Sequence, residues 1–419
     1  MKKIREGYKA YEFGEIPSDW KVKKIGDIFS DLRAGSTPSR KIEDYFTGDI
    51  PWITSGELKY KVIYDTLEKI TEEAVKDTNL ELYPEGTFFI AITGLEATGT
   101  RGSCAISGVE ATTNQSCMAF KPKDGFSNKY LYHWYRLYGD YIGLKYTQGT
   151  KQQSLNNKIV AELEIPVPKL EEQEKIASIL STVDEQIDNV DGLINKNKEL
   201  KKGLMQQLLT KGIGHTKFKK TEIGEIPEEW EVKTLDLIGE IVTGSTPKTS
   251  EKDNYGDEYL WVSPGDLGIK KYVTDTVKML SHKGFSKTRK LPKGAILVTC
   301  IGSTIGKMGI SRTELSTNQQ INSIICNDKA NSEFIYYALN YNFKMYTSYI
   351  STQAVPIINK TTFGEFLIQI PSIQEQTKIA LLLSEVDKRI EEYENKKQKL
   401  EELKKGLMQQ MLTGKIRVI

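Results

Sequence analysis

The feature that most constrains this chain is a long heptad pattern that occurs twice. Residues 171–209 and 374–412 place apolar side chains at steps of three and four between charged ones, and each segment closes on a near-identical stretch, 201–210 and 404–413. Such spacing is typical of a helix that buries one narrow seam against another helix. At about 1.5 Å per residue, each helix would extend roughly 58 Å. We expect the two helices to pair.

The alternative is a long helix on the surface of a single globular body. Charges flank the seam, however, and no proline interrupts either segment. Burying about eight apolar side chains per helix, at roughly 1.5–3 kcal/mol each, would contribute over 10 kcal/mol gross. A lone solvated helix forgoes that stabilisation.

The predicted seam slips near Asn197 and Lys397, where a polar residue takes an apolar position. Leu200 and Leu403 continue the periodicity beyond these slips. In the first segment the other seam positions are Ile176, Leu180, Val183, Ile187, Val190, Ile194, Leu204 and Leu208. In the second they are Ile379, Leu383, Val386, Ile390, Tyr393, Leu400, Leu407 and Met411.

The rest of the chain is duplicated as well. Residues 14–20 (GEIPSDW) return as 224–230 (GEIPEEW), Gly-Ser-Thr-Pro occurs at 35–38 and 244–247, and Thr-Asn-Gln occurs at 113–115 and 317–319. A tandem duplication of one globular part and one helix explains this order. We therefore divide the chain into a globular part at 1–168, a helix at 169–212, a second globular part at 213–371 and a second helix at 372–419.

Each globular part mixes strand and helix signals. Residues 87–92 and 295–299 are apolar runs bounded by proline and glycine, which is typical of buried strands. Residues 129–138 and 333–341 carry apolar and aromatic residues at helical spacing. The expected fold class is α/β of the α+β kind, with two globular domains that have largely β cores and two long helices that form an antiparallel coiled coil.

Composition limits the possible functions. The chain has 58 Lys and Arg against 56 Asp and Glu, a formal net charge of +2, so any nucleic-acid binding must come from local patches. The 4 cysteines form no CxxC pair, which favours buried thiols over disulfides or a metal site. No apolar segment follows the basic N-terminus, and no apolar run approaches about 18 residues. We expect a soluble, cytoplasmic protein with no membrane association.

Motifs for catalysis are missing from the sequence. It contains no Asn/Asp-Pro-Pro-aromatic tetrapeptide of the kind that adenine methyltransferases share and no glycine-rich cofactor loop in a βαβ unit. Residues 301–308 are similar to a phosphate loop, but the glycines are one residue too close and Met308 stands where a magnesium-binding hydroxyl belongs. The three histidines are scattered. A glycine-rich turn is the better interpretation, and the chain by itself is not expected to be an enzyme.

Taken together, the doubled motifs resemble the DNA-specificity subunit of a Type I restriction-modification system. The doubled 14–20 and 224–230 openings carry the resemblance, together with the Gly-Ser-Thr-Pro loops, EEQEKIA at 171–177, QEQTKIA at 374–380 and the two KKGLMQQ endings. The resemblance implies two target-recognition domains that each read half of a split double-stranded DNA site. It also implies that the paired helices are a spacer and a docking surface for two modification subunits, which restriction (translocase) subunits join.

The same resemblance implies that this chain carries no cofactor. S-adenosylmethionine, ATP and magnesium would belong to the partner subunits, and methyl transfer to a flipped adenine would be theirs. Half-sites about one duplex turn apart, roughly 34–36 Å, would suit helices of this size. Two alternatives are a fused DNA methyltransferase or endonuclease, and a coiled-coil scaffold without DNA specificity.

The duplication also sorts candidate DNA contacts, because two unlike half-sites need unlike readers. The shared Gly35, Trp52, Pro84 and Thr-Asn-Gln triplets are then scaffold, although Asn114 and Asn318 are of a type that pairs with adenine.

The candidate contacts are loop cations and hydroxyls of the kind that positions phosphates and recognises guanine. Residues 267–293 carry eight Lys and Arg and one acid, Asp275, although such a charge run also occurs on ordinary solvated faces. In the first half the candidates are Arg33, Ser36, Thr37, Lys59, Lys61, Arg101 and Lys151. In the second half they are Ser245, Thr246, Lys248, Lys270, Lys271, Lys283, Lys287, Arg289 and Lys307.

Overall fold

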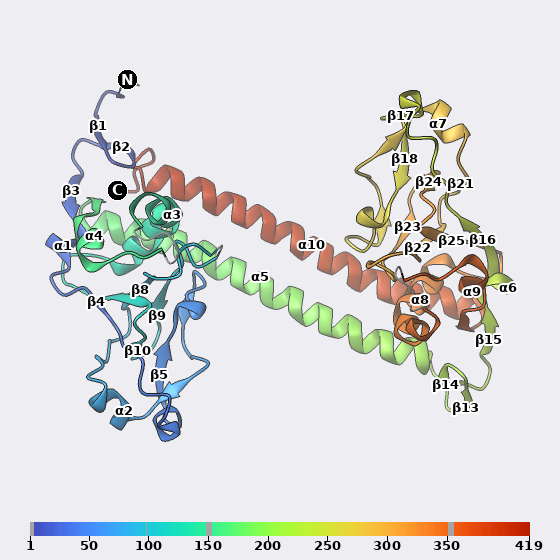
Figure 1. Cartoon of the computed structure of the whole chain (residues 1–419), viewed down its shortest axis with the longest axis horizontal. Coiled ribbons are helices and arrows are strands. Elements are labelled where there is room, and N and C mark those ends of the chain that lie inside the picture. The colour runs from blue at the N-terminus through green and yellow to red at the C-terminus, as the bar shows by residue number, and fades with distance from the viewer. Residues whose placement is uncertain (1–3, 98, 148–152, 351–355) are drawn as a thin grey trace. The chain divides into compact units, whose positions relative to one another are not determined.

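Two compact units make up the chain, and both contain parts of the two long helices. The computed structural model describes residues 4–97, 99–147, 153–350 and 356–419 (Figure 1). The first unit combines Met1–Asp191 with Asn395–Ile419, and the second is Gly192–Glu394. Helix α5 (Leu170–Thr210) and helix α10 (Ile373–Met411) are each continuous and contribute to both units. The chain thus leaves the first unit along α5 and returns to it along α10.

The first unit is built on a five-stranded central sheet in the order β4-β11-β8-β9-β6, a three-stranded sheet in the order β10-β5-β7, and the pairs β1-β2 and β12-β3. Its strands are β1 (Tyr8–Tyr11), β2 (Gly14–Pro17), β3 (Lys21–Lys24), β4 (Arg33–Ala34), β5 (Ile50–Ile53), β6 (Val62–Ile63), β7 (Lys69–Ile70), β8 (Phe88–Ala91), β9 (Cys104–Ser107), β10 (Thr112–Thr113), β11 (Cys117–Phe120) and β12 (Glu164–Val167). Its remaining helices are α1 (Ile25–Ile28), α2 (Glu72–Asp77), α3 (Asn128–Tyr146), α4 (Asn157–Glu162), η1 (Glu43–Phe46) and η2 (Ser55–Glu57).

The second unit repeats this plan. Its central sheet has the order β16-β25-β22-β23-β19, and its second sheet, β17-β20-β18-β24-β21, contains the counterparts of β7, β5 and β10. Its strands are β13 (Phe218–Thr221), β14 (Gly224–Pro227), β15 (Glu231–Thr234), β16 (Gly239–Thr243), β17 (Tyr255–Gly256), β18 (Tyr259–Val262), β19 (Tyr272–Val273), β20 (Met279–Leu280), β21 (Lys290–Leu291), β22 (Ile296–Thr299), β23 (Met308–Ser311), β24 (Leu315–Thr317), β25 (Ile321–Cys326) and β26 (Leu367–Ile370). Its remaining helices are α6 (Leu235–Ile238), α7 (His282–Ser286), α8 (Ser332–Tyr346), α9 (Lys360–Gly364), η3 (Lys252–Asn254), η4 (Pro264–Asp266) and η5 (Thr347–Tyr349).

Side-chain caps start the short helices at matching places in the two units. Asn156 accepts a hydrogen bond from the first turn of α4, and Asn359 does the same for α9. Ser127 caps α3, and Asn331 caps α8. These residues supply the oxygen that the unpaired N–H groups of a helix start require, so local sequence fixes where the helices begin.

The duplicated motifs meet where each long helix begins. In the first unit the Trp20 indole donates to Glu172, and the buried Gln173 donates to the Pro168 carbonyl while accepting from the Ser127 N–H. In the second unit Trp230 donates to Glu375, and Gln376 joins Pro371 to Asn331 in the same way. The tryptophan of one motif and the adjacent Glu-Gln pair of the other therefore form one joint at the start of each long helix.

Each core contains the start of one long helix and the end of the other. In the first unit Ile176 and Leu180 of α5 pack with Met408 and Met411 of α10 in the same apolar cluster as the central sheet. In the second unit Leu208 and Leu209 of α5 join Ile379 and Leu383 of α10. The repeated KKGLMQQ endings therefore complete the core of a unit other than the one in which their helix begins.

Within each unit the two long helices run antiparallel. In the first unit Asp191 pairs with Lys397 at 2.7 Å and Asp184 pairs with Lys404, so numbers rise on α5 as they fall on α10. In the second unit Lys201 pairs with Asp387 at 2.6 Å, and Lys198 with Glu394 at 2.8 Å. The predicted fold class, a mixed fold with two sheet-rich domains and long helices, is confirmed.

Most predicted seam residues lie inward. Ile187, Leu204, Tyr393, Leu400 and Leu407 are half-buried. Leu200 and Leu403 are 47% and 51% exposed, so the expectation that the seam continues through them is wrong. Each follows the predicted slip, where Asn197 and Lys397 are half-buried in the apolar row. The fully buried members are Ile176, Leu180, Val183, Val190, Ile194, Leu208, Ile379, Leu383, Val386, Ile390 and Met411.

No helix within the described ranges combines the length and the apolar character needed to cross a membrane.

Candidate nucleic-acid interface

The Gly-Ser-Thr-Pro loops lie against the Thr-Asn-Gln triplets in both units. The Ser36 N–H donates to the Thr113 carbonyl at 3.1 Å, and the Ser245 N–H donates to the Thr317 carbonyl at 2.8 Å. A Cβ added to Gly35 would lie 1.7 Å from the Thr113 oxygen, and one added to Gly244 would lie 2.0 Å from the Asn318 oxygen. Only glycine allows this approach, so the loop and the triplet form one rigid frame.

A tryptophan closes the same frame from the other side. The Trp52 indole donates to the Ser36 carbonyl at 3.2 Å, and the Trp261 indole donates to the Ser245 carbonyl at the same distance. Both rings are buried. Since a buried indole N–H needs an acceptor, the carbonyl fixes the loop and the ring together.

The triplet residues have separate roles. Thr113 and Thr317 are buried, and the Asn114 and Asn318 side chains accept the N–H two residues later, which forms a local turn. Gln115 and Gln319 are exposed, and each accepts a hydrogen bond from the loop threonine, Thr37 or Thr246. The asparagines thus serve the turn, while the glutamines face solvent.

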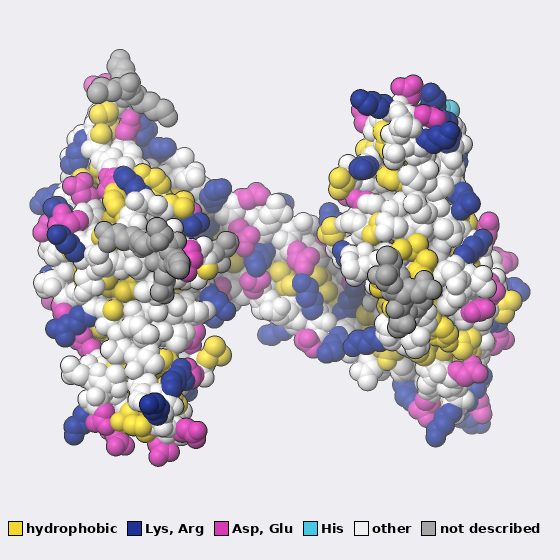
Figure 2. All heavy atoms as spheres, viewed as in Figure 1, with side chains coloured by type: hydrophobic (Ala, Val, Ile, Leu, Met, Phe, Trp, Pro, Cys, Tyr) yellow, Lys and Arg dark blue, Asp and Glu magenta, His cyan; other side chains and the backbone are white. Residues whose placement is uncertain are grey.

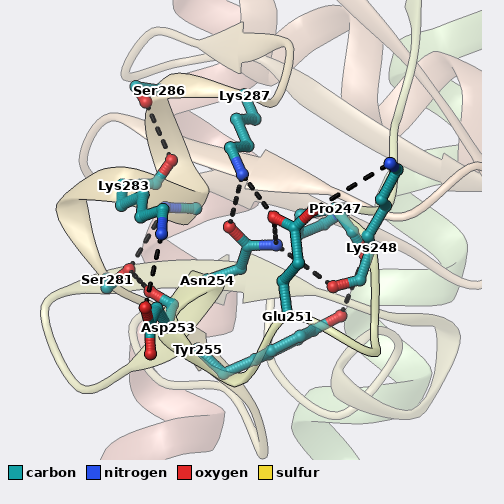
Figure 3. A network of polar contacts seen from close by, with 11 residues as sticks. Pro247, Lys248, Glu251, Asp253, Asn254, Tyr255, Ser281, Lys283, Ser286 and Lys287 are labelled. Carbon is teal, nitrogen blue, oxygen red and sulfur yellow. Dashed lines mark hydrogen bonds and ion pairs between the residues drawn. The ribbon is translucent and has the colours of Figure 1, made fainter.

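The basic cluster of the second unit is paired with acids from another segment (Figure 3). Lys287 contacts Glu251 at 2.6 Å and the Asn254 side chain at 3.0 Å, and Lys283 contacts Asp253 at 3.3 Å. Lys248 lies 3.9 Å from Glu251. The hydrogen bond from Lys287 lowers the pKa of the Glu251 carboxyl group. The cluster therefore presents ordered cations on a surface that is largely neutral.

Arg289 lies against the second Gly-Ser-Thr-Pro loop, beside this cluster. Its N–H donates to the Ser245 hydroxyl at 3.0 Å, and its guanidinium Nη1 donates to the Thr243 carbonyl at 2.7 Å. The side chain is exposed. The structure thus brings together three of the predicted contacts, Ser245, Thr246 and Arg289, at the glycine-containing loop.

Lys271 lies elsewhere in the second unit. Its ammonium group contacts Glu333 at 3.0 Å, the Tyr337 hydroxyl at 3.0 Å and the Ser384 hydroxyl at 2.7 Å, and the side chain is 9% exposed. Burial lowers the pKa of this ammonium group. Three internal partners occupy its donors, so we leave Lys271 out of the proposed interface.

The remaining predicted residues are spread over both units. Arg33 precedes the first loop and pairs with Asp31 at 2.5 Å, and Arg101 pairs with Asp140 of α3 at 2.7 Å. Lys151 lies outside the described residues. The other predicted cations are exposed, namely Lys59, Lys61, Lys270 and Lys307.

Arg40 was missing from the predicted contacts. It lies two residues beyond the first Gly-Ser-Thr-Pro loop, pairs with Glu68 through both guanidinium nitrogens, and covers the Phe46 ring at 4.2 Å and the Trp52 ring at 5.3 Å. Its position directly after a duplicated loop was the signal that could have identified it.

The surface charge of both globular regions is mixed. On the face shown in Figure 2, Lys and Arg side chains alternate with Asp and Glu side chains. Among the described residues, no group of three His, Cys, Asp or Glu side chains could hold a metal ion. What the duplicated frame offers is hydrogen-bond donors and cations held at fixed places, which suits contacts to nucleic-acid backbone and base edges.

Comparison with known protein families gives one match for both halves. The family described as Type I restriction modification DNA specificity domain matches residues 17–199 and 227–402.

Two curated relatives from one organism match along nearly their whole length. The Type I restriction enzyme MjaVIII specificity subunit of Methanocaldococcus jannaschii is 29% identical over 437 residues, which cover 99% of this chain and 98% of that protein. The putative Type I restriction enzyme MjaX specificity subunit of the same organism is 30% identical over 432 residues, which cover 99% and 97%.

Solved structures share the fold. The S subunit of a Type I restriction-modification system from M. genitalium aligns with a TM-score of 0.65 at 17% identity, over 94% of this chain and 96% of that one. A chain from a study of complex assembly and conformational transition of the Type I system aligns with a TM-score of 0.53 at 15% identity, over 97% and 100%.

Proposed function

Because this chain belongs to the Type I restriction modification DNA specificity family, we propose that it reads an asymmetric, two-part DNA site for two identical modification subunits. The chain is a specificity subunit and not itself the enzyme, since catalysis is carried by partner subunits. The observation that carries the proposal is the pair of equivalent frames, Gly35–Trp52 and Gly244–Trp261, within globular regions whose other loops differ. Equivalent frames with unlike surroundings suit two unlike half-sites.

The division of labour follows the duplication. Residues 1–168 and 213–371 are the two target-recognition domains, and residues 169–212 and 372–419 are the spacer and docking helices. Two near-identical helix segments offer two near-identical surfaces, so they recruit two copies of one partner by pseudo-two-fold symmetry. Restriction subunits join this assembly in the cytoplasm. S-adenosylmethionine, ATP and magnesium are bound by the partners.

The proposed DNA contacts centre on the frames. In the second region Ser245, Thr246 and Arg289 lie together, with Lys248, Lys283 and Lys287 on the adjoining cluster. In the first region Ser36 and Thr37 are the counterparts of Ser245 and Thr246, Arg33 lies just before the same loop, and Arg40 is added to them. Lys59, Lys61, Arg101, Lys270 and Lys307 remain as outer candidates.

Methylation mapping tests the function. Cells that express the chain together with its modification subunit should carry N6-methyladenine at one asymmetric, two-part sequence, and cells without the chain should carry none. Methylation that persists without the chain would contradict the proposal. Binding of S-adenosylmethionine by the purified chain alone would support the fused-enzyme alternative, and assembly without any sequence preference would support the scaffold.

A heptad insertion tests the spacer. Seven residues added after Ile194 of α5, with seven added after Glu394 of α10, keep the apolar register and lengthen each helix by about 10 Å. The mapped site should gain unread base pairs between the same two half-sequences. Altered half-sequences would rule out a spacer role.

Substitution of Arg289 tests the interface. Arg289→Ala should weaken binding through the second half-site and reduce the salt dependence by about one released counterion for each lost phosphate contact. Lys287→Ala should act in the same direction. Affinity that is unchanged at every salt concentration would remove these residues from the interface.

A further inference from the structure

The glutamine of each Thr-Asn-Gln triplet is exposed, and a role in the packing of the frame does not explain this position. In both units the threonine is buried and the asparagine forms the turn, while Gln115 and Gln319 are exposed. A solvent-facing side chain adds little to the packing of the frame. Its presence at the same place in both halves therefore needs another reason.

Each glutamine is held in one orientation. Thr37 donates its hydroxyl hydrogen to Gln115 Oε1, and Thr246 donates to Gln319 Oε1. Both threonines are exposed as well. A hydrogen bond between two exposed side chains contributes little to stability, because water competes for both partners. Its effect is to order the amide.

The ordered amide presents a donor. With Oε1 engaged by threonine, the Nε2 group keeps two N–H bonds, and neither amide nitrogen donates to another side chain or carbonyl within the described ranges. A cation lies on the same frame in each unit. Arg289 binds Ser245, the residue before Thr246, and Arg40 covers the Trp52 ring that binds Ser36.

We propose that Gln115 and Gln319 donate their amide N–H groups to DNA phosphates at equivalent places in the two half-sites. Residues that are identical in both halves cannot distinguish unlike sequences, but every duplex offers the same phosphates. Glutamine is among the side chains that make such contacts. The two glutamines fix the register of each domain, and the divergent loops recognise the bases.

A base contact is the rival explanation. Glutamine recognises adenine through two bonds, one donated to N7 and one accepted from N6. The threonine hydroxyl already takes one of the two lone pairs of Oε1 in both units, whereas both N–H bonds of Nε2 remain available. The geometry therefore favours an anion over a base edge.

The test rests on the proposed function and uses the full chain assembled with its modification subunits. Methylation mapping first gives the recognised sequence. Binding is then measured on a duplex with that sequence and on a random-sequence duplex of equal length. A wild-type complex that does not prefer the mapped duplex would overturn the proposed function itself. If the wild-type complex does prefer the mapped duplex, the affinities of the glutamine variants test the phosphate contact.

Three substitutions at each glutamine give separate expectations. Gln115→Met removes the donor and should weaken binding to the mapped duplex roughly 3–10-fold. Gln115→Glu sets a negative charge against phosphate and should weaken it on the order of 10–100-fold at low salt. Gln115→Lys should keep the affinity within about 3-fold and steepen the salt dependence by roughly one counterion, because an ammonium group also donates to phosphate. The Gln319 series should repeat this pattern.

The controls separate contact from structure. Asn340→Asp adds the same charge on an exposed position of α8, outside the proposed interface and the docking helices, and should leave binding unchanged. The mapped recognition sequence should be the same for every variant. A changed or relaxed base at one position would overturn the proposal in favour of a base contact. Unchanged affinity of the Glu variants, or losses matched by lower unfolding temperatures, would overturn it in favour of scaffold.

Discussion

The two units complete the same joint with different residues. In the first unit Glu172, which is 1% exposed, accepts from the Trp20 indole and from Arg417, near the end of the chain, at 2.6 and 2.9 Å. In the second unit Glu375 accepts from Trp230, and His215 lies 3.0 Å from it. The duplicated carboxylate is thus served in one unit by the chain terminus and in the other by the segment after α5. Duplication fixed the acceptor, and the position in the chain determined its partner.

The helix pair differs between the units in a similar way. In the first, Asp184 accepts from Arg136 of α3 at 2.9 and 3.0 Å and pairs with Lys404 of α10, while His133 contacts Ser181. In the second, Asp387 pairs with Lys201 and accepts from Tyr337. Tyr337 occupies the place of His133, and the added cation there, Lys271, comes from the globular region. The Asp–Lys pair is common to both units, and the third partner is not.

The largest expected effect concerns the frames, which are alike. Gly35→Ala and Gly244→Ala each drive a Cβ into a backbone oxygen, so each should destabilise its own unit by more than about 3 kcal/mol. Calorimetry of the full chain should show one lowered transition in each case. Gly203→Ala and Gly406→Ala are controls on the helices, where a Cβ meets no atom within 4 Å, and should stabilise by roughly 0.5–1 kcal/mol. If only one of the two variants, Gly35→Ala or Gly244→Ala, lost stability, the two frames would not be equivalent.

The next effect concerns the joint at the start of each long helix, where only the first unit, among the residues that the structure describes, has an arginine. Arg417→Met leaves the Glu172 carboxylate buried with the indole alone, so the first unit should lose roughly 1–3 kcal/mol, a range reduced for the partial exposure of the arginine. The second unit should unfold as before. Lys415→Met, an exposed neighbour, is the matched control. If Arg417→Met lowered both transitions equally, the terminus would not be specific to the first joint.

A smaller effect depends on pH. Burial lowers the pKa of Lys404 to about 8. The unfolded chain therefore binds more protons between that value and the ordinary pKa near 10.5, and stability from this group should rise with pH across the interval. The gain should be on the order of 1–3 kcal/mol, and Lys404→Met should abolish it. Denaturant midpoints at several pH values measure the difference, with the exposed Lys405→Met as control. Identical profiles for Lys404→Met and the wild type would contradict the expectation.

The smallest effect concerns one backbone position. Tyr60 has a φ of 57°, and its N–H donates to the Cys104 carbonyl. In the second unit Gly268 has a φ of 80°, and its N–H donates to the carbonyl of Met308, the equivalent of Cys104. Gly268→Ala should cost about 1–2 kcal/mol, because a Cβ is disfavoured there. Tyr60→Ala brings no new backbone cost and should lose only side-chain contact. Chemical unfolding of both variants measures the difference, and equal losses would mean that φ is not the cause.

Much of the architecture was predictable from the chain because its causes are local or repeated. Heptad spacing predicted the two helices, and the doubled motifs predicted two α/β units and the scaffold role of Gly35 and Trp52. The candidate site was only partly predictable. Gln115 was assigned to the scaffold with its triplet, and Arg40 was missed, because sequence similarity does not tell which members of a shared motif face solvent.

The sequence by itself determined the repeat, the helical periodicity and the family, because these depend on residue order alone. The tertiary structure decided which charges are free. Residues 267–293 carry eight Lys and Arg and only one acid, yet Glu251 and Asp253 approach Lys287 and Lys283 from an earlier segment, and Lys271 turns inward to Glu333. Electrostatic interaction depends on distance in space, which only the folded chain defines.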